Sequence, residues 1–294
     1  MENIETEQLY SEYKPLLFSL AYRMLGSVMD AEDIVQETFL TVYKSGLDHI
    51  QNMKAYMCKI VTNRCLELLR TTSKQREVYI GTWLPEPLVT NASDETDPMQ
   101  SYLQKESLST AYLLLLQQLS YMERAVFLLR EAMQYDYEEI ADIVGKSSAN
   151  CRQLFHRAKR SLNAKYDPDH LDHLDREQTT NLVEQFMSAL TSGDAAQIMK
   201  CLSTDAVLFT DGGGKVKVLP QPLHGNLRIS NIMAVYFKKH PWSYTYRNTL
   251  VNGLPGIVVY IDEKTLTVIS FKVLDGQLVN LYIVANPDKL THVH

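Results

Sequence analysis

The sequence lacks the features that would place it in a membrane, outside the cell or around a metal ion. Its apolar runs are too short to cross a membrane, and its N-terminus lacks the basic-then-apolar pattern of a signal peptide. Its four cysteines form no CxxC pair, so neither a zinc site nor a disulfide framework is favoured. We therefore expect a cytoplasmic protein with small buried cysteines and with no metal or cofactor.

An excess of positive charge is also missing, because the net charge at pH 7 is −6. An acidic chain repels nucleic acid on average, although phosphate binding requires only local positive charge. A basic segment therefore remains a candidate DNA-binding element. The overall acidity argues against strong DNA binding by the isolated chain and predicts that a partner is required.

The 294 residues, of which 45% are hydrophobic and 22% charged, are typical of a globular protein with two or three domains. Apolar side chains recur at helical spacing in residues 4–72 and again in residues 105–166, so we expect two all-α domains. Residues 73–104 contain two prolines one residue apart and an acidic stretch that cannot bury a core. This composition predicts a linker.

Residues 176–294 mix helical and strand-like patterns, which indicates a separate α+β domain. The predicted helices are Thr179–Leu190, Ala195–Leu202 and Arg228–Lys239. The predicted strands are Ala206–Thr210, Lys215–Leu219, Trp242–Val251, Gly256–Ile261, Leu266–Leu274 and Gln277–Ala285. Asp275-Gly276, between the last two strands, is a strong hairpin signal.

The most informative segment runs from Tyr137 to Arg160 and predicts two short helices joined by a turn at Gly145, which can adopt a positive φ. The apolar contacts between the two helices are expected from Ile140, Val144, Cys151 and Leu154. The outer face of the second helix would then read a DNA major groove. The residues on that face and in the basic run after it are Ser148, Ala149, Arg152, Gln153, His156, Arg157 and Arg160. An ordinary helical hairpin is the alternative interpretation.

Two earlier helices carry polar faces as well as apolar ones. The helix that starts near Asp30 buries Ala31, Ile34, Val35, Thr38, Phe39 and Val42, and exposes Asp30, Glu32, Asp33, Gln36 and Glu37. That acidic face is either solvated or a docking surface for a basic partner helix. The next helix, from about Asn52 to Arg70, buries Met57, Ile60, Val61, Leu68 and Cys65, with Lys59, Thr62, Asn63 and Arg70 on the opposite side. Such a stripe can track a strand backbone, and the loop Gly46–Asn52 can cradle an unstacked base.

Taken together and in order, these segments resemble the extracytoplasmic-function sigma factors of bacterial RNA polymerase. The resemblance rests on Asp30–Phe39, Asn52–Tyr56, Ile60–Arg70 and the helix-turn-helix, and it spans about Leu9 to Ala164. It implies that Asp30–Phe39 docks on the β′ clamp helices of core polymerase and that the second helical domain reaches the β flap. It also implies that Asn52 and Lys59–Arg70 read the −10 element, and that Ser148–Arg160 read the −35 element.

Three further motifs are similar to those of one sub-group, the SigJ-type factors, which carry a fused SnoaL-like domain. They are Trp83-Leu84-Pro85-Glu86-Pro87, Asp211-Gly212-Gly213-Gly214-Lys215 and Asn286-Pro287-Asp288-Lys289-Leu290. The resemblance implies that the fused domain packs against the sigma domains and tunes their activity. We expect the terminal motif and the Asp211 loop to hold the third domain against the first domain or the Trp83–Pro87 linker. A frayed tail is the alternative for the terminal motif.

Two other functions are possible on this sequence. A free-standing repressor or activator with one helix-turn-helix would leave Asp30–Phe39 and Asn63–Arg70 unexplained. An enzyme would use Asp205, Asp211 or His224 as a general base, with Tyr244, Tyr246, Tyr260 or Tyr282 as a proton donor. The sequence places no two of these side chains within hydrogen-bond reach, so we expect a non-catalytic protein.

Overall fold

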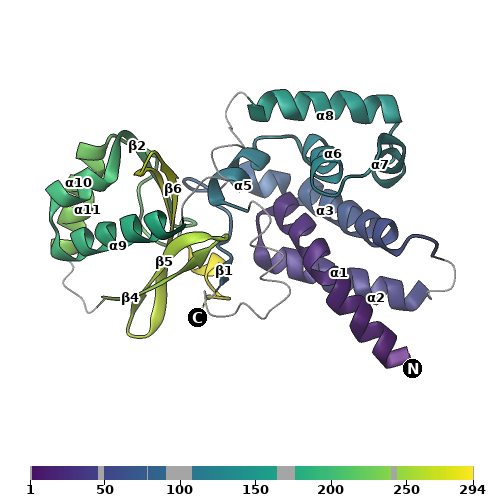
Figure 1. Ribbon diagram of the computed structural model, residues 1–294, viewed down its shortest axis with the longest axis horizontal. Helices are drawn as coiled ribbons and strands as arrows, with labels where there is room; N and C mark the ends of the chain where they lie inside the picture. Colours follow the sequence, from purple (N-terminus) through teal and green to yellow (C-terminus); the bar gives the residue numbers. More distant parts are fainter. Residues whose placement is uncertain are drawn as a thin grey trace. The chain divides into compact units, whose positions relative to one another are not determined.

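The computed structural model describes residues 2–45, 50–77, 79–90, 108–163, 176–239 and 244–293, and these form two compact units (Figure 1). Unit 1 contains the described residues of 2–77 and 112–163, which are entirely helical apart from their turns. Unit 2 contains 79–90, 108–111 and the described residues of 176–293. Residues 79–90, which the sequence predicted to be part of a linker, therefore belong to the α+β unit.

Unit 1 begins with three helices, α1 (Glu2–Leu25), α2 (Val28–Ser45) and α3 (Met53–Glu77). Gly26 ends α1 with a φ of 69°, and the Ser27 hydroxyl caps α2 by accepting a hydrogen bond of 3.1 Å from the Asp30 amide. The apolar face predicted for α2 is buried in full. In the described part of the chain no helix is long and apolar enough to span a membrane.

The buried stripe of α3 differs from the predicted one. Met57, Val61 and Cys65 are buried as expected, but Ile60 and Leu68 are only half-buried, and Thr62 is fully buried. The prediction that Thr62 lies on the polar side was therefore wrong. The physical reason is that α3 packs against α1, α2, α6 and α7, so its buried face is wider than the stripe that one neighbouring helix would cover. All four cysteines are buried and free, as expected.

The second half of unit 1 consists of α5 (Thr110–Gln117), α6 (Tyr121–Glu131), α7 (Tyr137–Val144) and α8 (Ser148–Asn163). A capping box formed by Asp136 and Glu139 begins α7. Gly145 ends it in the left-handed conformation, with a φ of 66°. Ile140, Val144, Cys151 and Leu154 are buried, which confirms the predicted apolar contacts of the helix pair.

The two helical halves share one compact unit because α6 and α7 pack on α1 and α3. The buried Arg124 guanidinium donates a hydrogen bond to the Met24 carbonyl at the end of α1. The Lys54 ammonium lies 5.6 Å from the centre of the Tyr135 ring, and that ring's hydroxyl also contacts Cys58. Burial raises the pKa of the Tyr135 phenol and that of the Cys58 thiol, so both groups are neutral in the packed state.

Unit 2 is a sheet covered by helices. The helices are α9 (Arg176–Ser192), α10 (Ala195–Cys201) and α11 (Asn226–Lys239), followed near the end of the chain by the 3₁₀ turn η2 (Pro287–Lys289). The strands are β1 (Val89–Thr90), β2 (Leu202–Asp211), β3 (Leu223–His224), β4 (Tyr244–Val251), β5 (Leu254–Ile261), β6 (Lys264–Leu274) and β7 (Gln277–Val284). Their order is β1-β4-β5-β6-β7-β2-β3, and only the β2–β7 pairing among them is parallel.

The outcome for unit 2 confirms most of the predicted elements. Asp275 and Gly276 have φ values of 50° and 71°, which is the two-residue hairpin that their sequence predicted. Residues 215–219 form a turn and irregular chain, so the strand predicted there was wrong. The glycines before that segment close a turn in which the Val216 amide donates to the Gly212 carbonyl. The short strands β1 and β3 were not predicted, because two residues carry no detectable alternation.

Replacing Gly145 with Ala should destabilise unit 1 by about 1 kcal/mol, because an L-residue in the left-handed region is strained. No atom lies within 4 Å of the position where the new Cβ would be, so backbone strain is the only cost. Gly145→Asn should lower the free energy of unfolding less than Gly145→Ala, since Asn tolerates the left-handed conformation. Urea unfolding followed by circular dichroism measures both variants. Equal losses would show that space, and not φ, constrains the turn.

Candidate functional site

The acidic face of α2 lies at the surface. Asp30, Glu32, Asp33, Gln36 and Glu37 are all exposed, as the sequence predicted. Met29, Leu40 and Tyr43 of the same helix are large apolar side chains that are also exposed. A helix that presents acids beside apolar side chains suits a partner surface with basic and apolar groups.

One of these acids is already engaged within unit 1. The Glu37 carboxylate forms an ion pair with Arg64 of α3, and Arg64 also donates a hydrogen bond of 3.2 Å to the Thr41 hydroxyl. Asp30, Glu32 and Asp33 show no ion pair among the described residues. The N-terminal part of the face is therefore its most available negative charge.

The polar stripe predicted on α3 is partly retained. Lys59, Asn63 and Arg70 are exposed, while Thr62 is buried and leaves the stripe. Asn52 has a structural role as well, because its side-chain oxygen caps α3 by accepting 3.0 Å from the Ala55 amide. The Arg70 guanidinium lies 5.9 Å from the centre of the Tyr121 ring. Residues 46–49 of the loop proposed to cradle a base lie outside the described residues.

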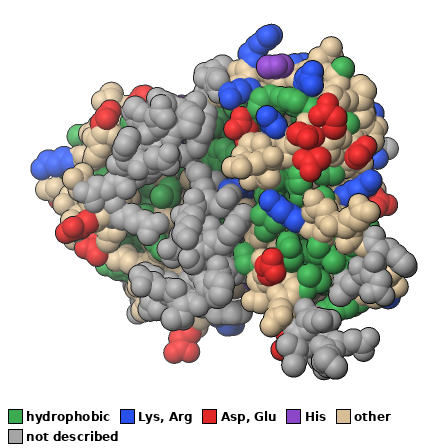
Figure 2. Space-filling view, turned by 45° about the vertical axis from the view of Figure 1, so that its right-hand side comes forward, with side chains coloured by type: hydrophobic (Ala, Val, Ile, Leu, Met, Phe, Trp, Pro, Cys, Tyr) green, Lys and Arg blue, Asp and Glu red, His purple; other side chains and the backbone are tan. Residues whose placement is uncertain are grey.

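The outer face of α8 is exposed and basic. Ala149, Arg152, Gln153, His156, Arg157 and Arg160 are exposed, and Ser148 is half-exposed. Figure 2 shows Lys, Arg and His side chains gathered along the top edge of unit 1, above a group of acidic side chains. A basic helix face that follows a tight turn is the geometry in which a helix-turn-helix enters a major groove.

Acids of α6 and α7 contact several of these basic side chains. Arg152 lies 3.8 Å from Glu138, which also accepts a hydrogen bond of 3.2 Å from Ser148. Arg157 pairs with Glu123 at 3.1 Å. The Arg152–Glu138 pair is exposed and therefore weak, whereas the Arg157–Glu123 pair joins an exposed arginine to a half-buried glutamate. Both arginines are exposed and can exchange partners.

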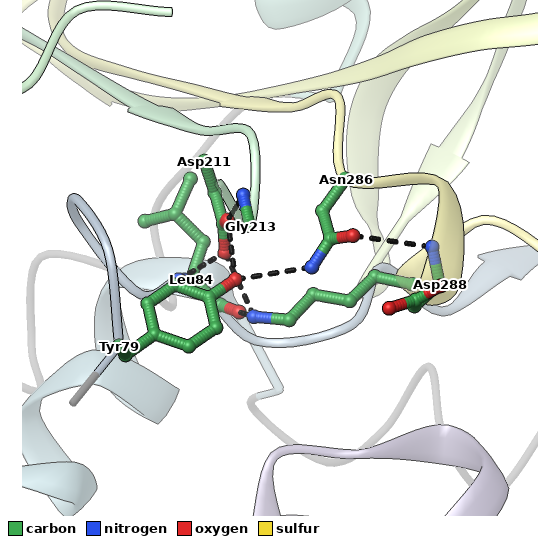
Figure 3. A network of polar contacts seen from close by, with 7 residues as sticks. Tyr79, Leu84, Asp211, Gly213, Asn286 and Asp288 are labelled. Atoms are coloured by element: carbon green, nitrogen blue, oxygen red, sulfur yellow. Dashed lines mark hydrogen bonds and ion pairs between the residues drawn. The ribbon is translucent and has the colours of Figure 1, made fainter. Parts of the chain in front are cut away.

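The third cluster is buried and centres on Asp211, whose side chain accepts four hydrogen bonds (Figure 3). Oδ1 accepts a hydrogen bond of 2.6 Å from the Tyr79 hydroxyl and one of 3.0 Å from the Gly213 amide. Oδ2 accepts a hydrogen bond of 2.8 Å from the Leu84 amide and one of 2.7 Å from the Lys289 ammonium. Because Asp211 is fully buried, each donor offsets part of the cost of removing its charge from water.

Lys289 joins the terminal motif to the linker motif. Its ammonium also donates to the Leu84 carbonyl and lies 4.3 Å from the centre of the Trp83 ring and 5.0 Å from that of Tyr79. An ammonium between two aromatic faces and a carboxylate is held by cation–π attraction as well as by the ion pair. Burial and the hydrogen bond to Asp211 raise the pKa of Tyr79, so its hydroxyl remains a donor.

Asn286 completes the cluster, which we call the Asp211 network: Tyr79, Trp83, Leu84, Asp211, Gly213, Asn286 and Lys289. The Asn286 side chain donates 3.1 Å to the Tyr79 hydroxyl and accepts 3.2 Å from the Asp288 amide. A Cβ on Gly213 would lie 2.3 Å from the Asn286 side-chain nitrogen, and Gly213 has a φ of 60°. Only glycine fits there.

The tail after β7 is therefore folded, contrary to the frayed alternative. Asn286, Lys289, Leu290 and Val293 are buried, and Pro287 and Asp288 are exposed within the turn η2. The frayed alternative left out residues 79–90, against which the tail packs through the Asp211 network. Of the predicted linker residues, Leu84, Pro85 and Pro87 are buried, and Trp83 and Glu86 are half-buried.

Residues 79–90 of the predicted linker and residues 108–110, just beyond it, are attached to unit 2. Beyond the Asp211 network, β1 pairs with β4, Leu88 exchanges hydrogen bonds of 2.8 and 2.9 Å with Asn252, and His292 Nε2 lies 2.9 Å from the Pro87 carbonyl. At the far end, the Leu108 carbonyl accepts 3.1 Å from Asn252, and Thr110 lies 2.8 Å from the Ser270 hydroxyl. Asn252 therefore bonds to both sides of the undescribed segment 91–107.

Comparison with known proteins identifies the two helical halves. Residues 9–75 match the family model of Sigma-70 region 2, and residues 109–162 match that of Sigma-70, region 4. The ECF RNA polymerase sigma factor SigJ of Mycobacterium tuberculosis is 31% identical across 96% of this chain and 93% of its own length. The chain belongs to the extracytoplasmic-function sigma factors.

Two more comparisons extend over the whole sigma factor. A probable ECF RNA polymerase sigma factor, SigI of M. tuberculosis, is 24% identical over 95% of this chain and 92% of its own. The crystal structure of M. tuberculosis SigJ superimposes with a TM-score of 0.76 and 28% identity, covering 96% of this chain and 97% of that one. The predicted fold class, two all-α sigma segments followed by an α+β domain, is thus confirmed.

The side chains considered for the enzyme alternative are not brought together in this sigma factor. Asp205 is exposed and accepts a hydrogen bond from Ser203, His224 is exposed, and Asp211 is committed to its network. One cavity of unit 2 lies beside β2 and α11, and of the four candidate tyrosines only Tyr244 lines it. No acid or histidine is among the described residues that line it.

Four residues of the linker attachment were missed by sequence reasoning: Tyr79, Asn252, Ser270 and His292. Tyr79 precedes the recognisable linker motif, and nothing in the sequence pairs it with Asp211. Asn252 was detectable in part, because Asn252-Gly253 between two strand patterns is a turn signal. Its bonds to residues on both sides of the linker depend on the tertiary fold.

Two Lys–Asp pairs of equal length allow the buried ion pair to be tested. Lys289–Asp211 and Lys215–Asp288 both measure 2.7 Å, but their side-chain exposures are 8% and 0% against 56% and 62%. Lys289→Met should destabilise unit 2 by about 3–5 kcal/mol, because it leaves a buried carboxylate without its cation. Lys215→Met should change stability by at most about 1 kcal/mol. Urea unfolding of both variants decides the matter, and similar losses would contradict this account.

Proposed function

We propose that this sigma factor recruits core RNA polymerase through α2, reads promoter DNA through α3 and α8, and sets the distance between the two readers by attaching its linker to the SnoaL-like domain. The observation that carries the last part is the Asp211 carboxylate, which accepts hydrogen bonds from two linker residues and from Lys289 of the terminal motif. Three motifs far apart in sequence meet at that one group.

The proposed polymerase-binding surface is Asp30, Glu32, Asp33, Gln36 and Glu37 with the exposed apolar residues beside them. Its support is the exposure of all five side chains and the match to region 2. The β′ clamp helices and the β flap are the polymerase elements expected from the family. Glu37 would have to exchange Arg64 for a basic group of the partner, so Glu32 and Asp33 are the better first contacts.

The proposed DNA surfaces lie on separate helices. Asn52, Lys59, Asn63 and Arg70 would contact the −10 element, and the exposed face of α8 would contact the −35 element. Support for the second assignment is the order of Gly145, the buried Cys151 and Leu154, and the exposed Arg152 and Gln153 between them. A polar pair at the start of a recognition helix is where base edges are reached.

The spacing proposal follows from what a tether does. A chain segment attached along its length allows a narrow range of distances between its ends, whereas a free one allows many. Residues 79–90 and 108–111 are attached to unit 2, which leaves 91–107 as the remaining length between them. Releasing residues 79–90 would lengthen the tether between the end of α3 and the start of α5. The distance between the two DNA readers would then be less restricted in any state in which α6 and α7 leave α1 and α3.

Reversing charge at the N-terminal part of α2 tests the docking surface. Glu32→Arg with Asp33→Arg should weaken binding to core polymerase by roughly two orders of magnitude, since like charges brought together cost several kcal/mol. Glu67→Arg, an equally exposed acid on α3, is the control and should bind normally. Co-elution with core and run-off transcription measure the effect. Retained binding by the double variant would place docking elsewhere, and initiation without core would instead indicate a free-standing regulator.

Loosening the Asp211 network tests the spacing proposal. Gly213→Ala drives a Cβ into Asn286, whereas Gly276→Ala imposes a similar positive-φ strain with no atom within 4 Å. Run-off transcription is measured on promoters whose −35 to −10 spacer varies in single base pairs. The Gly213 variant should tolerate more spacer lengths than the wild type, and the Gly276 variant should match the wild type. Identical spacer profiles at equal protein concentration would refute the proposal.

A further inference from the structure

Unit 2 contains a cavity that the sigma functions leave unused. It has a volume of about 290 Å³, and it lies between α11, the inner face of the sheet and the segment 216–219. This volume is at the small end of the range of roughly 300–1,000 Å³ in which proteins bind drug-sized molecules. A cavity of this size in a packed domain is a site that a small molecule can fill.

The interior of the cavity is apolar. Leu208, Val259 and Ile269 form its floor and are almost fully buried. The two threonine hydroxyls in its wall are already bonded to the backbone: Thr210 donates 3.1 Å to the Leu219 carbonyl, and Thr267 donates 2.8 Å to the Val284 carbonyl. Little hydrogen-bonding capacity remains for a polar ligand.

The remaining polar groups of the lining are Tyr244, whose hydroxyl is buried, and the exposed residues Lys217 and Tyr236. Burial, with the nearby Tyr236 phenol, raises the pKa of Tyr244 to about 12, so this phenol is a neutral donor at physiological pH. Val216, Lys217, Ile232 and Tyr236 line the cavity and are exposed, which places them at its mouth. Lys217 is the one charged side chain among the described lining residues.

We propose that this cavity binds a small, mainly apolar molecule with a single anionic end, such as a medium-chain or aromatic carboxylate. The apolar body would fill the space above Val259, and the anionic end would lie at the mouth beside Lys217 and Tyr236. The absence of an acid and a histidine from the described lining makes this a binding site and not a catalytic one.

The cavity shares two walls with the Asp211 network. Thr210 and Val216 flank the Asp211–Lys215 loop, and Ala285 lines the cavity while its amide donates 2.8 Å to the Asp211 carbonyl. A molecule in the cavity therefore touches the segments that hold Asp211 and Asn286. Transmission of its presence to the linker rests on the proposed function, whereas the binding itself does not.

Binding is tested on the full-length protein with anilinonaphthalene sulfonate, an apolar fluorophore with one negative charge. Decanoate, decanol and decyltrimethylammonium then compete for the site. Decanoate should displace the fluorophore best and decyltrimethylammonium worst. This order is opposite to the one expected from the protein's net charge of −6, which attracts a cation to the surface. Equal displacement by all three, or best displacement by the cation, would overturn the anionic specificity.

Matched variants locate the site. Ile232 and Val235 are apolar residues of α11 with similar exposures of 44% and 50%, but only Ile232 lines the cavity. Ile232→Glu should weaken decanoate binding about tenfold through charge repulsion at the mouth, whereas Val235→Glu should leave it unchanged. Val259→Phe, which fills the floor, should abolish binding. Equal effects of the two glutamates, or full binding by the Val259 variant, would place the ligand elsewhere.

Coupling is read separately through Trp83. The sequence has two tryptophans, so Trp242→Phe leaves Trp83, which contacts Lys289, as the only one. Saturating decanoate should shift its emission. If the Trp83 emission stays constant while decanoate is bound, the binding site stands and the proposed coupling to the linker is refuted. The spacer test on Gly213→Ala decides the proposed function independently of both.

Discussion

The arrangement of unit 2 depends on one buried carboxylate. Asp211 ends β2 at a point where no water reaches it, and its charge is balanced by a single ammonium, Lys289, and by three further donors. A buried ion pair adds little net stability over an apolar pair of similar size, because desolvation offsets the attraction. What it adds is selectivity: any arrangement that separates Asp211 from Tyr79, Leu84 or Lys289 leaves an unpaired buried charge. The linker is thereby restricted to one path across the SnoaL-like domain.

Sequence reasoning found most members of this network, but not Tyr79 and not the hydrogen bonds that join them. The motifs at Trp83–Pro87, Asp211–Lys215 and Asn286–Leu290 were each recognised, and a contact between them was expected from the family. The residues themselves carried a weaker signal, since three glycines indicate only a loop, and a short tail after the last strand resembles a frayed end. Hydrogen bonds between groups 78 to 207 residues apart are set by tertiary packing. The local sequence pattern therefore cannot predict these hydrogen bonds.

The faces of the helices were also predicted with different success. The face of α2 was predicted correctly because one side of this helix packs and the other meets solvent, which gives a clean period. The face of α3 was predicted with an error at Thr62 because four helices contact it, and a hydroxyl can be buried in such a setting. The turn at Gly145 was predictable for a different reason: helices often end in a residue with a positive φ, and that residue is usually glycine.

The acidity of the chain now has a local explanation in unit 1. Glu123, Glu131 and Glu138 face Arg157, Lys159 and Arg152 of α8, so part of the basic face is already neutralised before DNA arrives. The Arg152–Glu138 and Lys159–Glu131 pairs are exposed, and exposed pairs contribute about 1 kcal/mol or less; Glu123 is half-buried, but its partner Arg157 is exposed. Phosphates can therefore displace the glutamates, but the gain per contact is smaller than for a bare basic helix, and the repelling acids stay close by. Affinity for DNA from α8 alone must then be modest. A factor built in this way acts on promoters when polymerase supplies the remaining binding energy, which agrees with the proposal that the exposed acidic face of α2 binds polymerase.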